Sequence, residues 1–330
     1  MPDERYLVTG GTGCIGAWVV RNLVRESVPV AVLASRRRFD RLQLLLTDAE
    51  LGRMSVINGD INDLDALLEA SRRIGITTIV HLAALQVPFC AADPIAGARV
   101  NVQGTVTMFE LARRLEIGRL VYASSAAVYG PRSHYPDEVL PPDAELFPTS
   151  HYGVFKVANE QGARVAWETQ DVSSIGLRPH SVYGPGRDQG VTSKPTVAMI
   201  AAAAGRPYHV NFSGRAQFQF ADDVAKAFVA AARSTLTGAP VFSIGGPRIG
   251  VDEIIGAIED VEPGARGSIT SEDRALPFPE AFDGGPIEAA LGVQHETPLG
   301  DGVRQTIDCY RRAIRDGRIG DPYLDRVLAP

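Results

Sequence analysis

The sequence predicts an α/β protein in which a doubly wound parallel sheet is joined by a smaller α/β lobe. Short apolar runs alternate with helical segments through the first half of the chain, a glycine-rich turn separates the first strand from the first helix, and Pro and Gly become frequent after residue 180. Apolar runs without polar alternation are typical of strands that helices cover on both faces. We therefore expect ligands to bind at the carboxyl ends of the strands.

The first βαβ unit predicts a dinucleotide site. Its strand, helix and second strand are expected at residues 6–8, 17–25 and 28–33. Gly10, Gly13 and Gly16 stand between the strand and the helix, where backbone N–H groups can approach a pyrophosphate. Such a turn can also serve simple chain reversal, but this position favours a Rossmann unit. The residues assigned to the cofactor are Gly10, Gly13, Cys14, Ile15 and Gly16.

The remaining elements follow the same alternation. Further strands are expected at residues 54–57, 78–82 and 120–123, with helices at 64–73, 99–115 and 152–168. The second half is expected to hold helices at 195–204 and 222–234, strands at 217–220 and 241–244, loops between 263 and 298, and an amphipathic helix at 299–315. This pattern predicts a dinucleotide-binding domain over residues 1–180, to which residues 217–245 return, and a smaller substrate lobe over residues 181–330.

Composition narrows the class of protein. With 330 residues and a net charge of -6, the chain shows no basic footprint for nucleic acid. No apolar stretch approaches the ~20 residues that span a bilayer, and the first residues lack a signal-peptide pattern. We therefore expect a cytoplasmic protein with no membrane partner. Cys14, Cys90 and Cys309 lie far apart without C-x-x-C spacing, which favours neither a disulfide framework nor a metal site.

Tyr152 and Lys156 predict an acid/base pair. Because they are four residues apart on a helix, they share one face. A free phenol titrates near pH ~10, so a close cation is needed to bring its proton into use at neutral pH. We expect the ammonium group of Lys156 to supply that charge.

A series of motifs in order along the chain resembles the extended short-chain dehydrogenase/reductase family, and its NAD-dependent epimerase/dehydratase branch in particular. Besides the glycine turn and Tyr152-x-x-x-Lys156, the motifs are Gly59-Asp60, His81-Leu82-Ala83-Ala84, Asn101-Val102-x-Gly104-Thr105, the segment 122–130 with Ser125, Leu177-Arg178-Pro179, Val182-Tyr183-Gly184-Pro185 and the segment 221–225. The resemblance covers nearly the whole chain.

The resemblance implies roles for individual residues. Ser125 would hold the reacting oxygen, Tyr152 would exchange its proton, and Lys156 would hold the nicotinamide ribose. The cofactor-binding residues implied outside the glycine turn are Asp60, Ile61, Leu82, Ala83, Ala84, Asn101, Tyr152, Lys156, Pro179 and His180. The implied substrate-binding residues are Gln86, Ser125, Ala126, His180 and Arg187. Family members commonly dimerise, and a homodimer is expected through Val102, Val106, Phe109, Val157 and Val165.

Departures from the family pattern narrow the reaction. Dehydrating members carry an Asp-Glu pair where this chain has Ala126-Ala127, which cannot move a proton. Nucleotide-sugar epimerases carry an Arg-Asp pair that grips the diphosphate where this chain has Ala216-Gln217, and Arg215 is one residue out of register. The sequence therefore predicts weakened recognition of a nucleotide diphosphate. Arg187 is then either an anchor for an anionic substrate group or a solvated loop arginine.

The end of the second strand predicts the choice of cofactor. NAD-using members usually carry Asp or Glu there, whereas the run Ala34-Ser35-Arg36-Arg37-Arg38 offers three cations and no carboxylate. Ser35 and Arg36 would suit a 2′-phosphate, so NADP is favoured over NAD. Loop arginines can also be simply solvated, which leaves NAD open.

Together these inferences predict an NAD(P)-dependent oxidoreductase or epimerase that acts on a secondary hydroxyl of a sugar or sugar-like molecule by Tyr-assisted hydride transfer. An NADPH-dependent reductase of aldehydes or ketones is the alternative. A redox-sensing protein that only registers the dinucleotide is a second alternative, and the retention of Tyr152 and Lys156 disfavours it.

Overall fold

The large sheet of the protein is parallel throughout. The structure, a computed structural model, describes residues 4–35, 38–293 and 297–329. Seven strands lie in the order β11-β7-β5-β4-β1-β2-β3, and each neighbouring pair is parallel. The strands are β1 (Tyr6–Thr9), β2 (Val30–Ala34), β3 (Ser55–Asn58), β4 (Thr78–His81), β5 (Leu120–Ala123), β7 (Ser174–Arg178) and β11 (Val241–Ser243). The predicted doubly wound α/β class is confirmed.

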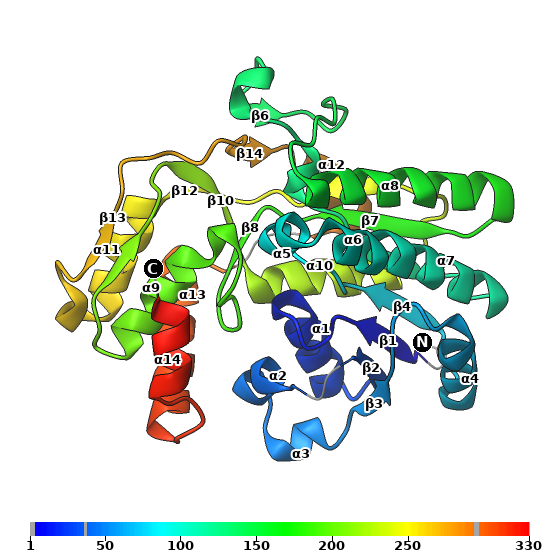
Figure 1. Cartoon of the computed structure of the whole chain (residues 1–330), viewed down its shortest axis with the longest axis horizontal. Coiled ribbons are helices and arrows are strands. Elements are labelled where there is room, and N and C mark those ends of the chain that lie inside the picture. The colour runs from blue at the N-terminus through cyan, green and yellow to red at the C-terminus, as the bar shows by residue number, and fades with distance from the viewer. Residues whose placement is uncertain (1–3, 36–37, 294–296, 330) are drawn as a thin grey trace.

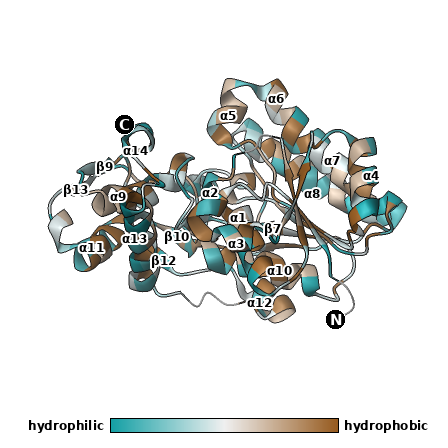
Figure 2. Ribbon diagram, turned by 90° about the horizontal axis from the view of Figure 1, so that it is seen from below, coloured by the Kyte–Doolittle hydropathy of each residue, from teal (hydrophilic) through white to brown (hydrophobic). Residues whose placement is uncertain are grey.

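Helices cover both faces of this sheet (Figure 1). The covering helices are α1 (Cys14–Arg25) and α10 (Ala221–Arg233) on one face, and α4 (Leu64–Ile74), α7 (Gly104–Arg114) and α8 (His151–Gln170) on the other. Alternate residues of a strand face opposite layers: Val8 and Val32 pack with α1 and α10, whereas Leu7 and Ala31 pack with α4 and α7. Figure 2 shows the apolar strands of the large sheet between these helices.

The helix predicted over residues 99–115 is not uniform. Arg99–Gln103 forms a π-helical turn, and α7 begins only at Gly104. The carbonyl of Asn101 in that turn accepts hydrogen bonds from Thr105 Oγ1 at 2.6 Å and Asn159 Nδ2 at 3.0 Å. Such side-chain bonds compete with the regular backbone ladder. The short helices before the turn are α2 (Asp40–Leu45), α3 (Asp48–Leu51), α5 (Val87–Ala92) and α6 (Pro94–Ala98).

The remaining strands form small sheets, most of them beside the large one (Figure 1). The pairings are β8 (Ser181–Tyr183) and β12 (Arg248–Gly250) with β10 (Arg215–Phe220), β9 (Tyr208–Val210) with β13 (Ile269–Ser271), and β6 (Val139–Leu140) with β14 (Ala281–Phe282). The helices are α9 (Lys194–Ala203), α11 (Val251–Val261), α12 (Gly285–Leu291), α13 (Leu299–Arg315) and α14 (Asp321–Leu328). The expectation of loops throughout 263–298 is wrong, because β13 and β14 find partner strands far away in the chain. The range predicted for α13 is confirmed.

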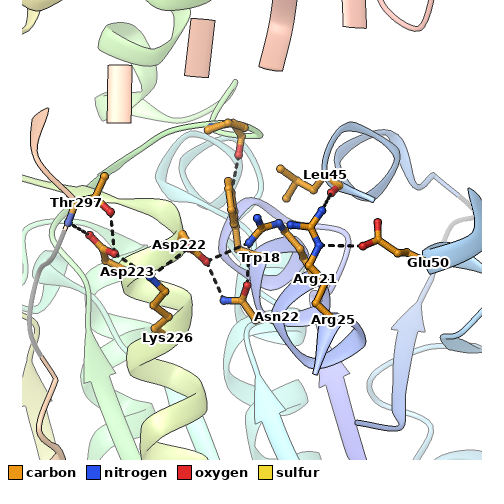
Figure 3. A network of polar contacts seen from close by, with 11 residues as sticks. Trp18, Arg21, Asn22, Arg25, Leu45, Glu50, Asp222, Asp223, Lys226 and Thr297 are labelled. Carbon is orange, nitrogen blue, oxygen red and sulfur yellow. Dashed lines mark hydrogen bonds and ion pairs between the residues drawn. The ribbon is translucent and has the colours of Figure 1, made fainter. Parts of the chain in front are cut away.

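A polar seam fastens α10 to α1 (Figure 3). Asn22 donates to Asp222 at 2.8 Å, and Arg21 lies 3.6 Å from the same carboxylate. Asp223 is 2% exposed and accepts hydrogen bonds from the backbone N–H and the hydroxyl of Thr297. These first-turn aspartates therefore tie α10 to the rest of the molecule. Through α10 and β11 the later chain completes the large sheet, whereas β10 pairs in a small one. The division into two domains stays a prediction.

Candidate active site

One large cavity opens at the carboxyl ends of the parallel strands. Its volume is about 1200 Å³. The wall contains residues that directly follow β1, β2, β3, β4, β5 and β7, together with residues of the smaller sheets' connections. This is where the topology of a doubly wound sheet leaves room for a ligand.

Nearly all of the residues predicted for the site line this cavity. They are Gly10, Gly13, Cys14, Ile15, Gly16, Ser35, Asp60, Ile61, Leu82, Ala83, Ala84, Gln86, Ser125, Ala126, Tyr152, Lys156, Pro179, His180 and Arg187. Asn101 does not reach the wall: its side chain is buried behind it and bonds to the N–H and the carbonyl of Leu85 at 2.7 and 2.9 Å. Arg36 lies outside the described residues.

The glycine turn has the shape of a phosphate cradle. Gly10 has a φ of +67°, and a Cβ there would lie 2.6 Å from the backbone N of Ala83. A Cβ on Gly16 would overlap the carbonyl oxygen of Gly10. Gly13 precedes α1 and provides no capping side chain, so the first N–H groups of α1 are left for a ligand. These residues fit the pyrophosphate of a dinucleotide.

Ser125, Tyr152 and Lys156 come together at the end of β5. Ser125 follows that strand, and Tyr152 and Lys156 lie in the first two turns of α8. Nζ of Lys156 lies 5.5 Å from the centre of the Tyr152 ring and donates to the carbonyl of Ala123 at 2.6 Å. Ser125 lies close enough to Tyr152 to lower the pKa of its hydroxyl. The three predicted catalytic side chains thus occupy one corner of the cavity.

The charges around Tyr152 differ in part from the sequence-based expectation. Burial raises the pKa of Tyr152 overall, although Ser125 and the positive charge of Arg187 lower it in part. Burial also lowers the pKa of Lys156 to about 8. The cation that lowers the pKa of the phenol is therefore Arg187, and the expected lowering by Lys156 is not found.

Two histidines near the cavity are held neutral. His81 bonds to Thr9 Oγ1 at 2.7 Å and Thr105 Oγ1 at 2.9 Å, and burial lowers its pKa to about 3. Nε2 of His180 donates to the carbonyl of Pro279 at 2.8 Å, and burial lowers the pKa of His180 to about 4. Neither ring is placed to exchange protons at neutral pH, but His180 lines the cavity.

A buried ion pair lies directly behind the catalytic corner. Arg178 donates to both carboxylate oxygens of Glu160, at 2.7 and 2.6 Å, and to the hydroxyl of Tyr129 at 2.7 Å. Ser124 donates to the same carboxylate. Burial lowers the pKa of Arg178, but its hydrogen bonds to Glu160 raise that pKa overall. This network connects β5, α8 and β7 close to the wall residues Ser125 and Lys156.

The loop that carries Arg187 is clamped from several sides. Trp18 donates to the carbonyl of Pro185 at 3.0 Å, and the N–H of Gly186 donates to the hydroxyl of Tyr310 at 3.0 Å. The Asp188 carboxylate accepts hydrogen bonds from Arg41 Nη2 at 2.5 Å, Arg41 Nε at 3.1 Å and the hydroxyl of Tyr323 at 3.1 Å. Arg41 also donates to the carbonyls of Gly186 and of Thr12 in the glycine turn. Sequence reasoning missed Arg41 and Asp188, because no local pattern reveals a pair so far apart in the chain.

The positions where the family's diphosphate grip was expected lie outside the cavity wall. The Gln217 side chain bonds to the carbonyl and the N–H of Phe282 and to the carbonyl of Gly246. Ala216 is buried, and Arg215 is exposed and pairs with Glu253 at 2.8 Å. These three side chains are therefore engaged elsewhere in the fold.

Comparison with known proteins places the chain in a family. Residues 6–245 match the NAD dependent epimerase/dehydratase family. The chain belongs to this family. A UDP-glucose 4-epimerase of Mycolicibacterium smegmatis is 29% identical over 320 residues, which are 93% of this chain and 98% of that protein. Family membership confirms the resemblance found in the sequence and the expectation of an NAD(P)-dependent enzyme of the extended short-chain dehydrogenase/reductase type.

Two solved structures extend the comparison. MoeE5 in complex with UDP-glucuronic acid and NAD has a TM-score of 0.76 at 28% identity, over 94% of this chain and 99% of that one. The UDP-glucose 4-epimerase of Thermotoga maritima with UDP-glucose has a TM-score of 0.80 at 20% identity, over 94% of this chain and 99% of that one, and supports the fold alone. The NAD in the MoeE5 complex is consistent with a nicotinamide dinucleotide site here and lends no support to a preference for NADP.

Other predicted features are reported for the described residues alone. Cys14 lies in the cavity wall, Cys90 and Cys309 are buried, and none of the three forms a disulfide. Within residues 4–35, 38–293 and 297–329, no group of His, Cys, Asp or Glu side chains is arranged to hold a metal ion. None of the described helices is long and apolar enough to cross a bilayer.

Proposed function

We propose that the protein oxidises a secondary hydroxyl of a sugar or sugar-like molecule with a nicotinamide dinucleotide, and that Tyr152 takes the hydroxyl proton. The observation that carries this proposal is the convergence of Ser125, Tyr152 and Lys156 in the cavity that also contains the glycine turn. Residues with these functional groups, at these positions, can bind a hydroxyl, remove its proton and hold the resulting charge.

The chain's own residues would act in a defined order. Ser125 would hold the hydroxyl oxygen of the substrate, and the Tyr152 phenolate would accept its proton. When bound, the dinucleotide supplies the acceptor for the hydride that leaves the same carbon. A carbonyl is formed, so two electrons and one proton leave with the hydride and one proton remains on Tyr152. The positive charge of Arg187 favours the phenolate that begins the cycle, and Lys156 would hold the ribose of the nicotinamide.

Substitution of Tyr152 tests this proposal directly. Tyr152→Phe is expected to lower kcat by about 10²- to 10⁴-fold, the usual contribution of a positioned acid or base. Dinucleotide affinity and the unfolding midpoint are expected to stay unchanged. Tyr208→Phe is the matched control, because Tyr208 lies in β9 outside the cavity wall. Turnover by Tyr152→Phe equal to that of the control would contradict the proposal and favour a protein that only registers the dinucleotide.

Net oxidation and epimerisation use the same residues and are separated by the fate of the cofactor. An epimerase must return the hydride to its own intermediate, so it is expected to keep a tightly held dinucleotide through purification. A dehydrogenase or reductase is expected to exchange it with the solution. The measurement is the amount and redox state of dinucleotide that denaturation releases from the purified protein. Family membership and the similarity to UDP-glucose 4-epimerases favour the epimerase.

The preference for NADP stays a proposal that rests on the residues after β2. Ser35 and Arg38 both line the cavity, and Arg38 forms an exposed ion pair with Asp40 at 2.8 Å. A 2′-phosphate would compete with Asp40 for that arginine. Arg38→Gln is expected to weaken NADP binding several-fold and to leave NAD binding unchanged, as measured by calorimetry. Tighter binding of NAD than of NADP by the unsubstituted protein would overturn this preference.

The homodimer and the cytoplasmic location also stay proposals. Val106 on α7 and Val165 on α8 are 60% and 46% exposed, which suits an apolar contact between two copies. Phe109 is unavailable for that contact because it is buried and packs edge-on against Tyr122, with ring centres 5.8 Å apart. The joint change of Val106 and Val165 to Glu is expected to yield monomers in analytical ultracentrifugation if this face is the interface.

A further inference from the structure

Arg187 lines the cavity and has no anionic partner among the described residues. Its Nη2 donates to Thr192 Oγ1 at 3.3 Å, and its Nε is covered from solvent and bonds to no other described group. No ion pair links Arg187 to a carboxylate in the described part of the chain, and burial lowers its pKa. Arg187 is half-buried, and a partly desolvated cation that no carboxylate balances is stabilised when an anion reaches it.

A polar acceptor without a partner lies beside this arginine. Oε1 of Gln86 is also covered from solvent and bonds to no described donor. Both groups face Gly190: a Cβ on Gly190 would lie 2.6 Å from Gln86 Oε1 and 3.1 Å from Arg187 Nη2. Gly190 has a φ of +100° and lines the cavity, and only a glycine allows the backbone to pass this close to both the donor and the acceptor.

Most other arginines of the described wall are already matched by protein groups. Arg38 pairs with Asp40, Arg41 with Asp188, and Arg99 with Asp60. Arg326 lies over the ring of Tyr323 at 5.3 Å. Near Tyr152, an incoming ligand therefore meets one arginine whose charge is not balanced. That arrangement suits a single negative charge, whereas a nucleotide diphosphate would bring two.

We infer that the substrate is a free hydroxy acid of the sugar-acid class, whose carboxylate binds Arg187 and whose neighbouring hydroxyl donates to Gln86 Oε1. A carboxylate accepts hydrogen bonds from Nε and Nη of one guanidinium in a fork that no neutral sugar reproduces. The hydroxyl supplies the donor that Gln86 lacks. This inference rests on the proposed function for the position of the reacting hydroxyl, but the binding of the acid needs no turnover.

The test compares ligands of matched shape by calorimetry, with NAD or NADP present at saturation. D-Gluconate and D-glucuronate are the acid probes, D-glucitol and D-glucose are their neutral counterparts, and UDP-glucose and UDP-glucuronate are the nucleotide probes. At least one acid is expected to bind about tenfold or more tightly than its neutral counterpart, the gain typical of a charge-assisted hydrogen bond. That acid is also expected to bind more tightly than UDP-glucose.

Three variants locate the effect. Arg187→Met is expected to reduce the preference for the acid to less than about threefold, and Arg187→Lys to keep part of it, because a lysine retains charge without the fork. Gln86→Glu places a carboxylate beside Arg187 and is expected to weaken the acid about as much as Arg187→Met does. The same measurements in Tyr152→Phe are expected to keep the preference for the acid over its neutral counterpart, because both probes lose the same contact with the phenol.

Several results would overturn the inference while leaving the proposed function intact. They are equal affinities for acids and neutral counterparts, tighter binding of UDP-glucose than of every free acid, no detectable binding of either acid, or an acid preference that survives Arg187→Met. The opposite failure is also distinguishable. Normal turnover by Tyr152→Phe would refute the proposed function, yet Arg187-dependent binding of an acid would stand.

Discussion

Two arginines from one stretch of chain, the buried Arg178 and the half-buried Arg187, differ in the partners that the fold provides. Arg178, behind the cavity wall, has two bonds to Glu160 and one to Tyr129, and its guanidinium lies 5.2 Å from the centre of the Tyr129 ring. Arg187, in the wall, has one long bond to Thr192. The pKa of the first is raised and that of the second is lowered by burial. Arg178 therefore stabilises the fold, whereas Arg187 is available to bind a ligand.

The largest expected effect is on the satisfied arginine. Arg178→Met leaves the carboxylate of Glu160 buried without its main partner, and the loss of one member of such a pair typically costs about 3 to 5 kcal/mol. Urea unfolding measures this loss. The double change Arg178→Met with Glu160→Met is the control and is expected to recover most of the stability. A single variant as stable as the unsubstituted protein would break the contrast.

The second effect concerns His81, a buried group that is satisfied only while it is neutral. Its pKa of about 3 in the folded protein lies below the ordinary value of 6.5, so the unfolded chain binds the proton first as the pH falls. The stabilisation that this shift contributes is complete above pH 6.5 and is lost toward pH 3, by at most about 1.4 kcal/mol per pH unit. His81→Asn is expected to flatten the decline of unfolding free energy between pH 6.5 and 4. Parallel curves for the two proteins would show that His81 does not contribute.

The third effect sharpens the role of the clamp around Arg187. Asp188→Asn keeps the size of the side chain but removes the charge that two nitrogens of Arg41 contact. We expect a loss of about 1 to 2 kcal/mol in stability and a rise in KM that exceeds the change in kcat, because the loop positions a substrate anchor. Arg38→Gln is a control for the loss of an exposed ion pair, and it is expected to change stability by less than about 0.5 kcal/mol.

The smallest effect is expected for the unsatisfied arginine. Arg187→Met removes a half-buried charge without leaving a carboxylate behind, so the free energy of unfolding should stay within about 1 kcal/mol of the original value or rise slightly. The comparison with Arg178→Met uses the same chemical change at both positions. A loss of 3 kcal/mol or more at Arg187 would show that it belongs to the fold as firmly as Arg178 does.

Local patterns in the sequence account for much of the fold and of the catalytic corner. The glycine turn lies between a short strand and a helix, and apolar residues recur at helical spacing over 299–315. Both patterns involve residues close together in the chain, so the sequence alone reveals them. Ser125, Tyr152 and Lys156 were identified by their motif and lie together. Their catalytic roles remain proposals.

Features that depend on distant partners could not be read from the sequence. β14 exists because it pairs with β6, and the segment around it looks like a loop by its Pro and Gly residues. Arg41 and Asp188 meet across the fold, and neither residue has a neighbour that signals the contact. The close approach of Gly190 to Gln86 depends on where Gln86 points, which only the folded chain determines.

The bond between Trp18 and Pro185 makes the loop around Arg187 observable by optical means. The chain has two tryptophans. The indole of Trp18 holds the loop, whereas Trp167 lies at the far end of α8, near Gly238. A Trp167→Phe protein would therefore emit from the indole that touches the loop, and a shift in its fluorescence on adding an acid would report, in real time, whether the loop adjusts as the ligand arrives.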